Sequence, residues 1–310
     1  MNKPPNILVL GGLNMGLIAR AERLPKPGET LCGNRFYHSS GGKGATQAVA
    51  AARLGAQVAM VGRVGDDLFG PALLDALRRD QIDVSDVAVD ADHATGAGVI
   101  VVDGSGQNHI VAVYGANLQC DEAQLQAIER RIDSADVLML QMEVPFELSL
   151  RAATAARERE VRVILDPAPA FPIPASAYPH LDIVAPNQTE VEIHTGVVVD
   201  DVASARRAAA ILLERGVGVA IVKMAELGAF YATADGGGHV SPFAAVAVDT
   251  TSAGDAFHGA LAVALAERTP LAEAVRFGAA AGALAVTRPG VQDSMPRREE
   301  VEALLATGNG

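Results

Sequence analysis

Short runs rich in β-forming residues alternate with Ala-rich helical runs along most of this 310-residue chain. The strand-like runs are residues 6–10, 57–62, 137–140, 161–165, 182–186 and 218–223. The helical runs are residues 43–54, 70–80, 147–159 and 188–194. Such alternation is typical of repeated βαβ units, in which helices cover both faces of a parallel sheet. It predicts an α/β fold with a doubly wound, mainly parallel sheet flanked by helices, in a single domain over residues 1–310.

Two segments interrupt this alternation, residues 13–41 and residues 95–115. The second has alternating apolar residues on either side of "DGSG" at 103–106, and the glycines there permit the positive φ angles of a tight turn. We therefore expect a β-hairpin, and the two segments together predict a small β-sheet that stands off the core as a lid. Such a lid either covers a site or buries its apolar face against a second subunit.

The formal net charge of −12 argues against a broad surface for nucleic acid or anionic membranes, because both need clustered Lys and Arg. No stretch reaches the roughly 18 uninterrupted apolar residues of a membrane span, and the N-terminal apolar run lacks a signal-peptide cleavage site. Cys32 and Cys120 lie far apart, and we interpret them as buried thiols in a reducing compartment. These features predict a cytoplasmic protein with small-molecule partners.

The segment "DTTSAGDAFHGA" at 249–260 places Asp255 after a run of small residues, just before an apolar helical pattern. The first amide groups of a helix lack partners within the helix and can bind an anion, and Ala253 and Gly254 have no bulk to obstruct one. Alternatively, Ser252 or Asp255 caps the helix. From this segment alone both interpretations stay open.

A glycine-rich turn, "SSGGKGA" at 39–45, precedes the first Ala-rich helix. It is not a Walker A loop, because Gly44 stands where that motif requires Ser or Thr after the Lys. One interpretation is a turn at Gly42 that lets the backbone approach a ligand. The other is a helix-entry turn with a solvated Lys43.

The segment "PNQTE" at 186–190 follows a strand-like run. Asn187 can cap the next helix, and Glu190 can favour the positive end of its dipole. The pair also occupies the carboxyl end of a strand, where α/β folds place ligands. A structural and a functional interpretation are both open here.

Taken together, these and other ordered segments resemble the ribokinase family of carbohydrate kinases. The matching segments run almost from end to end: "PKPGET", "GGKGATQAVAAARLGA", "VGRVGDDLFG", "YGAN", "LQMEVP", "LDPAPA", "PNQTE", "VDTTSAGDAF" and "AVTRPGVQ". The resemblance implies ATP-dependent phosphorylation of a primary hydroxyl of a pentose under a mobile β lid, with ribose as the expected substrate and ribose 5-phosphate as the product. It also implies Mg²⁺, an activating K⁺ and a homodimer joined through the lid.

By this resemblance, Asp255 is the general base that removes the hydroxyl proton. The amides around Ala253, Gly254 and Asp255 then form an anion hole for the transferring charge. Besides Asp255, the expected sugar contacts are Asn14, Gly42, Lys43 and Glu143.

The nucleotide and metal residues are implied in the same way. The expected nucleotide contacts are Asn187, Lys223, Gly228, Ala253, Gly254 and Ala279. Glu190 is expected to place Mg²⁺ through water, because this ion keeps much of its hydration shell. The expected K⁺ site lies beside the anion hole and consists of Asp249, Thr251, Ala285, Arg288, Gly290 and Ser294.

Four positions depart from the family pattern. Gly16 stands where these kinases usually have Asp, and Thr46 where they usually have Asn, and both usual residues hydrogen-bond the sugar. A lost hydrogen bond to a charged group costs roughly 1.5–3 kcal/mol, or about one to two decades of affinity. The substrate is therefore open between ribose, another sugar and a nucleoside, and a non-catalytic sugar- or nucleotide-binding protein is a further alternative. Lys223 and Ala225 replace a common Thr and Gly, which leaves the choice between ATP and GTP open.

Overall fold

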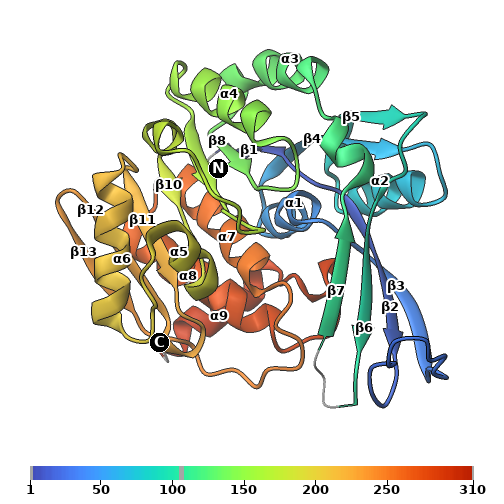
Figure 1. Ribbon diagram of the computed structural model, residues 1–310. Coiled ribbons are helices and arrows are strands. Elements are labelled where there is room, and N and C mark those ends of the chain that lie inside the picture. Colours follow the sequence, from blue (N-terminus) through green and yellow to red (C-terminus); the bar gives the residue numbers. More distant parts are fainter. Residues whose placement is uncertain (1–2, 105–107, 309–310) are drawn as a thin grey trace.

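The structure is a computed structural model that describes residues 3–104 and 108–308. Within these residues, nine strands form the larger of two sheets (Figure 1). In sheet order they are β13 (Gly236–Val240), β12 (Ala229–Thr233), β11 (Val219–Lys223), β10 (Ile183–Val184), β9 (Arg162–Leu165), β8 (Val137–Leu140), β1 (Asn6–Leu10), β4 (Gln57–Gly65) and β5 (Asp83–Asp90). From β11 to β5 the neighbouring strands are parallel, whereas β12 and β13 at one edge run antiparallel to their neighbours. The chain winds outward from β1 in both directions, which confirms the predicted doubly wound, mainly parallel sheet.

Helices cover both faces of this sheet (Figure 1). One face carries α1 (Lys43–Arg53), α2 (Phe69–Arg79), α7 (Ala253–Ala266), α8 (Leu271–Ala285) and α9 (Arg298–Ala306). The other carries α3 (Glu122–Arg131), α4 (Phe146–Arg157), α5 (Gln188–Thr195) and α6 (Val202–Glu214). In β1, Ile7 and Val9 pack with the first set of helices, while Leu8 and Leu10 pack with the second. A strand buried on both faces needs apolar residues in succession, which explains the unbroken run at 6–10.

A second sheet, here called the lid sheet, stands beside the first (Figure 1). In sheet order its strands are β3 (Arg35–Gly41), β2 (Asn14–Arg20), β6 (Gly96–Val102) and β7 (Asn108–Val113). All four come from the two segments that interrupt the alternation. Strands β6 and β7 pair antiparallel as the predicted hairpin, while Ser105 and Gly106 of its predicted turn lie outside the described residues.

The two cysteines differ in their surroundings. Cys120 is buried, but Cys32 is exposed in the connection between β2 and β3, so the prediction of a buried thiol was wrong for Cys32. That connection belongs to the lid and contributes nothing to either hydrophobic core. Both cysteines are free thiols. Between residues 3 and 308, leaving out 105–107, no helix is both long enough and apolar enough to cross a membrane.

Candidate active site

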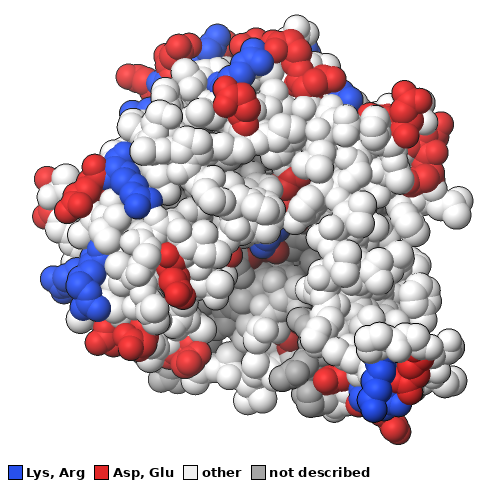
Figure 2. Space-filling view, viewed as in Figure 1, with Lys and Arg blue, Asp and Glu red and all other residues white. Residues whose placement is uncertain are grey.

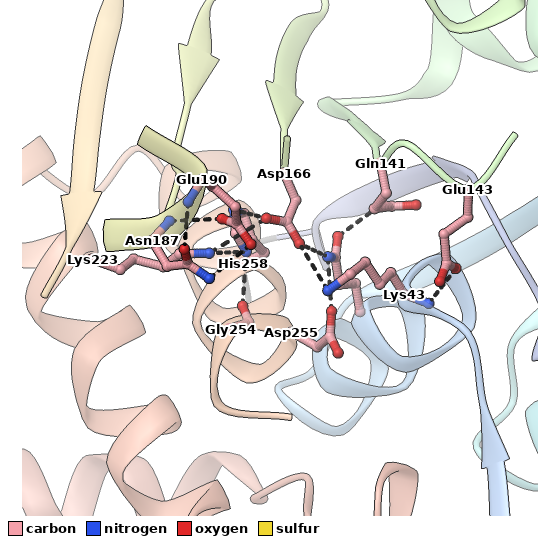
Figure 3. Close-up of polar contacts among 11 residues, drawn as sticks. Lys43, Gln141, Glu143, Asp166, Asn187, Glu190, Lys223, Gly254, Asp255 and His258 are labelled. Carbon is pink, nitrogen blue, oxygen red and sulfur yellow. Dashed lines mark hydrogen bonds and ion pairs between the residues drawn. The ribbon is translucent and has the colours of Figure 1, made fainter. Parts of the chain in front are cut away.

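Polar side chains from different strands meet at one edge of the large sheet. Strands β8 to β11 are parallel, so their carboxyl ends lie together. Glu143 follows β8, Asp166 follows β9, Asn187 follows β10, and Lys223 ends β11. Figure 3 shows these side chains gathered around the first turns of α1 and α7. Figure 2 shows a hollow in the molecular surface with acidic and basic atoms on its floor. Doubly wound folds bind ligands at this edge of the sheet.

Asp255 lies in the first turn of α7, which begins at Ala253. Ser252 makes no capping hydrogen bond through its side chain, and Oδ1 of Asp255 accepts a hydrogen bond from Nε2 of Gln47 at 3.0 Å. The backbone amides of Gly254 and Asp255 have no acceptor in the described part of the chain. The amide of Ala253 donates to the carbonyl oxygen of Thr250 at 3.4 Å, so the unpaired amides favour an anion site over a helix cap at residues 254 and 255.

The carboxylates of this cluster have unusual pKa values. Burial raises the pKa of Asp255 to about 6, although attraction to Lys43 opposes the shift. Burial likewise raises the pKa of Glu143 to about 7 against the same attraction. Burial would lower the pKa of Lys43, but the charges of Asp255 and Asp166 outweigh it and raise that pKa. A carboxylate that ionises near neutral pH beside a permanent cation is suited to act as a general base.

The glycine turn before α1 brings Lys43 into the cluster. Gly42 has a φ of 89°, and a Cβ there would lie 2.6 Å from the backbone nitrogen of Asn14, so the turn requires glycine. The amide of Lys43 donates to Oε2 of Glu143 at 2.7 Å, and its Nζ lies 4.0 Å from Oδ2 of Asp166. The turn therefore holds Lys43 against Glu143 and near Asp166, with Gly42 packed on the backbone of Asn14.

The two positions that depart from the family pattern at the sugar lie close to these residues in the chain. Gly16 lies on β2, two residues after Asn14, and a Cβ at Gly16 would be 3.3 Å from the carbonyl oxygen of Ser39. Thr46 is fully buried in α1, and its hydroxyl has no hydrogen-bond partner among the described residues. Oδ1 of Asn14 accepts a hydrogen bond from Nδ2 of Asn117 at 2.9 Å. Gly16 thus offers no side-chain acceptor, whereas Thr46 keeps an unpaired hydroxyl.

Asn187 and Glu190 cap α5 as the structural interpretation expects. Oδ1 of Asn187 accepts from the amide of Glu190 at 2.9 Å, and Oε2 of Glu190 accepts from the amide of Asn187 at 2.7 Å. Oε1 of Glu190 also accepts from Nδ2 of Asn187 at 2.8 Å. Burial raises the pKa of Glu190. Asn187 also pairs with Lys223 as an extension of the sheet. Asn187 therefore both caps α5 and lies at the strand ends where ligands bind.

The other expected nucleotide residues come from three different elements. A Cβ on Gly254 would be 3.4 Å from Nζ of Lys223, so this ammonium lies beside the predicted anion hole. Gly228 has a φ of 85° and ends the short turn that follows β11. Ala279 lies on α8, which packs against α7, since a Cβ on Gly282 would be 3.1 Å from the carbonyl oxygen of Ala253.

Three of the expected K⁺ residues are joined by hydrogen bonds. Oδ1 of Asp249 accepts from the amide of Thr251 at 3.0 Å and from its hydroxyl at 2.6 Å. Oδ2 of Asp249 accepts from the amide of Gly290 at 3.4 Å. The Asp249 carboxylate and the Thr251 hydroxyl are hard oxygen donors that suit an alkali cation.

The remaining expected K⁺ residues are arranged differently. The carbonyl oxygen of Ala285 accepts from the amide of Arg288 at 3.3 Å, and the Arg288 guanidinium pairs with Glu300. The hydroxyl of Ser294 donates to the carbonyl oxygen of Val291 at 2.8 Å. No hydrogen bond in the described residues joins Ser294 to Asp249. The Arg288 side chain is therefore paired with Glu300 on α9, and only the backbone of Arg288 is left to contact a cation.

Several buried polar residues at the centre of the cluster escape prediction from the sequence. Nε2 of Gln141 donates to Oε1 of Gln47 at 2.7 Å, and Nε2 of Gln47 in turn donates to Oδ2 of Asp166 at 2.9 Å as well as to Asp255. Burial would raise the pKa of Asp166, but the surrounding cations hold it below its usual range. The available signal is positional, because Asp166 directly follows a buried strand and Gln47 lies one helical turn after Lys43.

Comparison with known proteins agrees with this site. A family model described as pfkB family carbohydrate kinase matches residues 4–298. Ribokinase of Haemophilus influenzae is 38% identical over 299 residues, covering 96% of this chain and 98% of that protein. Deoxyribokinase of Salmonella typhi is 34% identical over 302 residues, covering 97% and 99%. The structure of Arabidopsis thaliana ribokinase complexed with ribose and ATP has a TM-score of 0.90 at 33% identity and covers 98% of this chain and 99% of that one.

The chain belongs to the pfkB family of carbohydrate kinases. It is therefore a phosphotransferase that acts on a sugar hydroxyl. The family suggested by its ordered motifs is confirmed.

Proposed function

We propose that this protein is an ATP-dependent kinase that phosphorylates the primary hydroxyl of ribose and releases ribose 5-phosphate. The observation that carries the proposal is the position of Asp255, a carboxylate with a pKa of about 6 beside the unpaired amides of Gly254 and Asp255 itself. A base and a set of free donors in one helical turn are what phosphoryl transfer to a hydroxyl requires. The ribokinase relatives and the ribokinase structure with ribose and ATP support these substrates.

In the proposed reaction, Asp255 takes the proton of the primary hydroxyl, and the sugar oxygen attacks the γ-phosphorus while the bond to the departing ADP breaks. The amides of Ala253, Gly254 and Asp255 donate to the oxygens of the transferring group. A preorganised donor of this kind is worth roughly 3–4 kcal/mol of barrier. Gln47 fixes the base through its 3.0 Å hydrogen bond to Asp255.

In this proposal, the residues that bind the sugar are Asn14, Gly42, Lys43 and Glu143. Oε2 of Glu143 accepts a hydrogen bond from the amide of Lys43 at 2.7 Å. Oε1 is therefore the oxygen of Glu143 that is left to accept hydrogen bonds from sugar hydroxyls. The Lys43 side chain is 30% exposed and can donate into the hollow. Gly42 keeps this turn close to the backbone of Asn14.

Asn187, Lys223, Gly228 and Ala279 are the proposed nucleotide contacts. Mg²⁺, when bound with ATP, neutralises charge on the phosphates. Glu190 fits a role in holding that ion through water, because both carboxylate oxygens already accept hydrogen bonds but keep further lone pairs. No group of three or more acidic, His or Cys side chains in the described ranges can hold a metal ion by itself, so the proposed Mg²⁺ depends on the nucleotide.

An activating K⁺ is proposed at Asp249, Thr251, Ala285, Arg288, Gly290 and Ser294. When bound, this ion supplies positive charge that steadies the loop leading into Ala253. The donor chemistry supports it at Asp249, Thr251 and Gly290, which hydrogen bonds already join. Arg288 contributes through its carbonyl oxygen in this proposal, since its side chain is paired elsewhere.

We further propose that residues 1–310 form one kinase domain and that two copies associate through their lid sheets. Exposed apolar side chains on the lid support the dimer, among them Val99 and Val111, which face each other across β6 and β7. The cytoplasmic location stays a prediction.

A second candidate substrate is a deoxypentose or a nucleoside. Gly16 favours it, because this position offers no side-chain acceptor to a sugar hydroxyl. The similarity to deoxyribokinase also supports a deoxypentose.

The test is an ADP-release assay with ATP and Mg²⁺, with and without K⁺, on ribose, deoxyribose, other pentoses, ketohexoses and nucleosides. We expect ribose to give the highest kcat/KM and K⁺ to raise it. Turnover confined to deoxyribose or nucleosides would move the assignment to the second candidate. Ligand-induced thermal stabilisation without turnover of any acceptor would indicate a binding protein.

A further inference from the structure

Lys223 carries a positive charge to the first turn of α7, beside the predicted anion hole. It ends β11 beside Asn187, and its side chain is 13% exposed. Its Nζ lies over the first turn of α7, because a Cβ on Gly254 would come within 3.4 Å of it. Figure 3 shows Lys223 and Lys43 approaching Asp166 from opposite sides. The two cations therefore border different parts of one site.

Asp166 and His258 surround this ammonium. Oδ1 of Asp166 lies 3.4 Å from Nζ of Lys223, and the Asp166 side chain is 2% exposed. Nδ1 of His258 lies 3.5 Å from the same Nζ. That ring nitrogen also lies 2.7 Å from the carbonyl oxygen of Gly254, which can only accept, so Nδ1 carries the proton and donates there. His258 therefore offers Lys223 no acceptor at Nδ1, and Asp166 forms the ion pair with it, while the carboxylate of Glu190 is close enough to interact with the same charge.

Lys223 keeps donor capacity for a further anion. An ammonium has three N–H donors, and Asp166 accepts from Lys223 at 3.4 Å, which is long for a charge-assisted hydrogen bond. Gly254, whose amide is unpaired, lies next to this ammonium, and the unpaired amide of Asp255 follows it in the same helical turn. An anion bound to those amides would come within reach of Lys223. At that position the anion is the group being transferred, because Asp255, the proposed base, is in the same turn.

We propose that Lys223 hydrogen-bonds the γ-phosphoryl group of the nucleotide during transfer, and that Asp166 is the residue that positions Lys223. The proposal rests on the kinase function proposed above. Lys223 stays protonated throughout the step. The proton of the acceptor hydroxyl goes to Asp255, the new P–O bond forms to the sugar oxygen, and the bond between the γ-phosphorus and the departing ADP oxygen breaks. Lys223 thus adds a fixed charge to the donors that the helix amides supply.

The first test measures nucleotide binding without sugar, by calorimetry in Mg²⁺ with ADP and with β,γ-methylene ATP. Lys223→Met is expected to weaken the ATP analogue by about 10- to 100-fold, the range for a lost charge-assisted hydrogen bond, and to leave ADP binding nearly unchanged. Arg207→Met on α6 is the matched control, since Arg207 is exposed and, among the described residues, makes no hydrogen bond or ion pair with Lys223, Asp166 or His258. Equal weakening of both nucleotides, or no weakening of the analogue, would overturn the contact with the γ-phosphoryl group.

The second test measures turnover. Lys223→Met is expected to lower kcat by about 100-fold with little change in the sugar KM, and Lys223→Arg, which keeps the charge, is expected to lose less. If Lys223→Met fails to fold because the buried Asp166 loses the nearer of its two cations, the double variant Lys223→Met/Asp166→Asn removes both charges together. A kcat for the folded variant equal to that of the wild type would overturn the catalytic role.

The third test isolates Asp166 through a double-mutant cycle. Its readout is the ratio of the ADP dissociation constant to that of the ATP analogue, which a general loss of packing would not change. Asp166→Asn is expected to lower this ratio in the wild-type background and to leave it unchanged in the Lys223→Met background. A decrease that persists in the Lys223→Met background would overturn the positioning role. If the wild type phosphorylates no acceptor, the proposed function fails, while the nucleotide ratio still decides the role of Lys223.

Discussion

At the scale of single residues, the account depends on how burial and one nearby cation adjust Asp255. Burial disfavours the ionised carboxylate, while Lys43 favours it, and the balance leaves the pKa at about 6. The same opposition acts on Glu143, with a pKa of about 7. Both carboxylates therefore change charge close to physiological pH, and the ionised form of Asp255 is the one that accepts a proton.

We predict that kcat of the wild type falls as pH decreases through about 6, because protonated Asp255 cannot act as a base. Below that pH, log kcat is expected to decline by about one per pH unit. The measurement is a pH profile of kcat at saturating sugar and nucleotide. Near-ultraviolet circular dichroism at each pH is the control, because the buried His258 has its pKa lowered to about 4 and so costs stability as pH falls from 6.5 towards that value. A kcat that stays constant down to pH 5 in folded protein would contradict the base assignment.

At the scale of elements, glycine turns connect strands to the helices that carry the site. Gly42 has a positive φ and lies against the backbone at Gly12, Leu13 and Asn14, with a Cβ position 2.5 Å from the carbonyl oxygen of Gly12. This close approach joins the N-terminus of α1 to the first strand of the lid sheet. The position of Lys43 therefore depends on a residue without a side chain.

We predict that Gly42→Ala lowers the free energy of unfolding by about 2–4 kcal/mol, through backbone strain and steric overlap together. Gly28→Ala is the matched control, because Gly28 also has a positive φ, of 80°, but has no atom within 4 Å of its Cβ position. Urea denaturation of both variants measures the difference. Equal losses at the two positions would indicate that backbone conformation alone matters and that the close approach at Gly42 does not.

The element pattern could be predicted from the sequence, because strands buried on both faces and Ala-rich helices each leave a local signature. The predicted runs at 43–54 and 70–80 correspond to α1 and α2. The first residue of α7 was harder to predict from the sequence, since the apolar pattern begins at Ala256 while the helix begins at Ala253. Small residues without apolar periodicity form its first turn, and their packing against α8 is a tertiary effect that local sequence does not record.

The centre of the site could be predicted only in part. Asp255 and Lys43 lie in distinctive segments at helix starts, so sequence reasoning identifies them. Asp166 and Gln47 become site residues only because α1 lies against the carboxyl end of β9, which places the Gln47 amide between two carboxylates. That contact joins residues more than one hundred positions apart, and no local pattern specifies it.

At the scale of the whole molecule, the lid sheet leaves several apolar side chains exposed to solvent in a single chain. Val99, Val111 and Val113 have exposed fractions of 49%, 65% and 58%. Val99 and Val111 are opposite one another in register, and Val113 lies two residues further along β7, so the three share one face. A contiguous exposed apolar face of this kind is typical of a protein interface.

We predict that the wild type is a dimer and that Val111→Asp shifts it to a monomer, because burying a charge in an apolar interface is strongly unfavourable. Light scattering coupled to size-exclusion chromatography measures the mass. Val198→Asp is the matched control, since Val198 is 62% exposed but lies outside the lid sheet, and its variant should remain a dimer. A wild type that is monomeric at all concentrations would refute the lid interface.

The central claim, that this chain is a sugar kinase with Asp255 as its base, is tested most directly by comparing Asp255→Asn with the wild type in two measurements. These are kcat for the preferred sugar and the dissociation constant of that sugar. The account predicts that kcat falls by about 10²–10⁴-fold while the dissociation constant changes little, because the amide keeps the shape of the carboxylate but cannot accept the proton. Near-normal turnover in Asp255→Asn would contradict it.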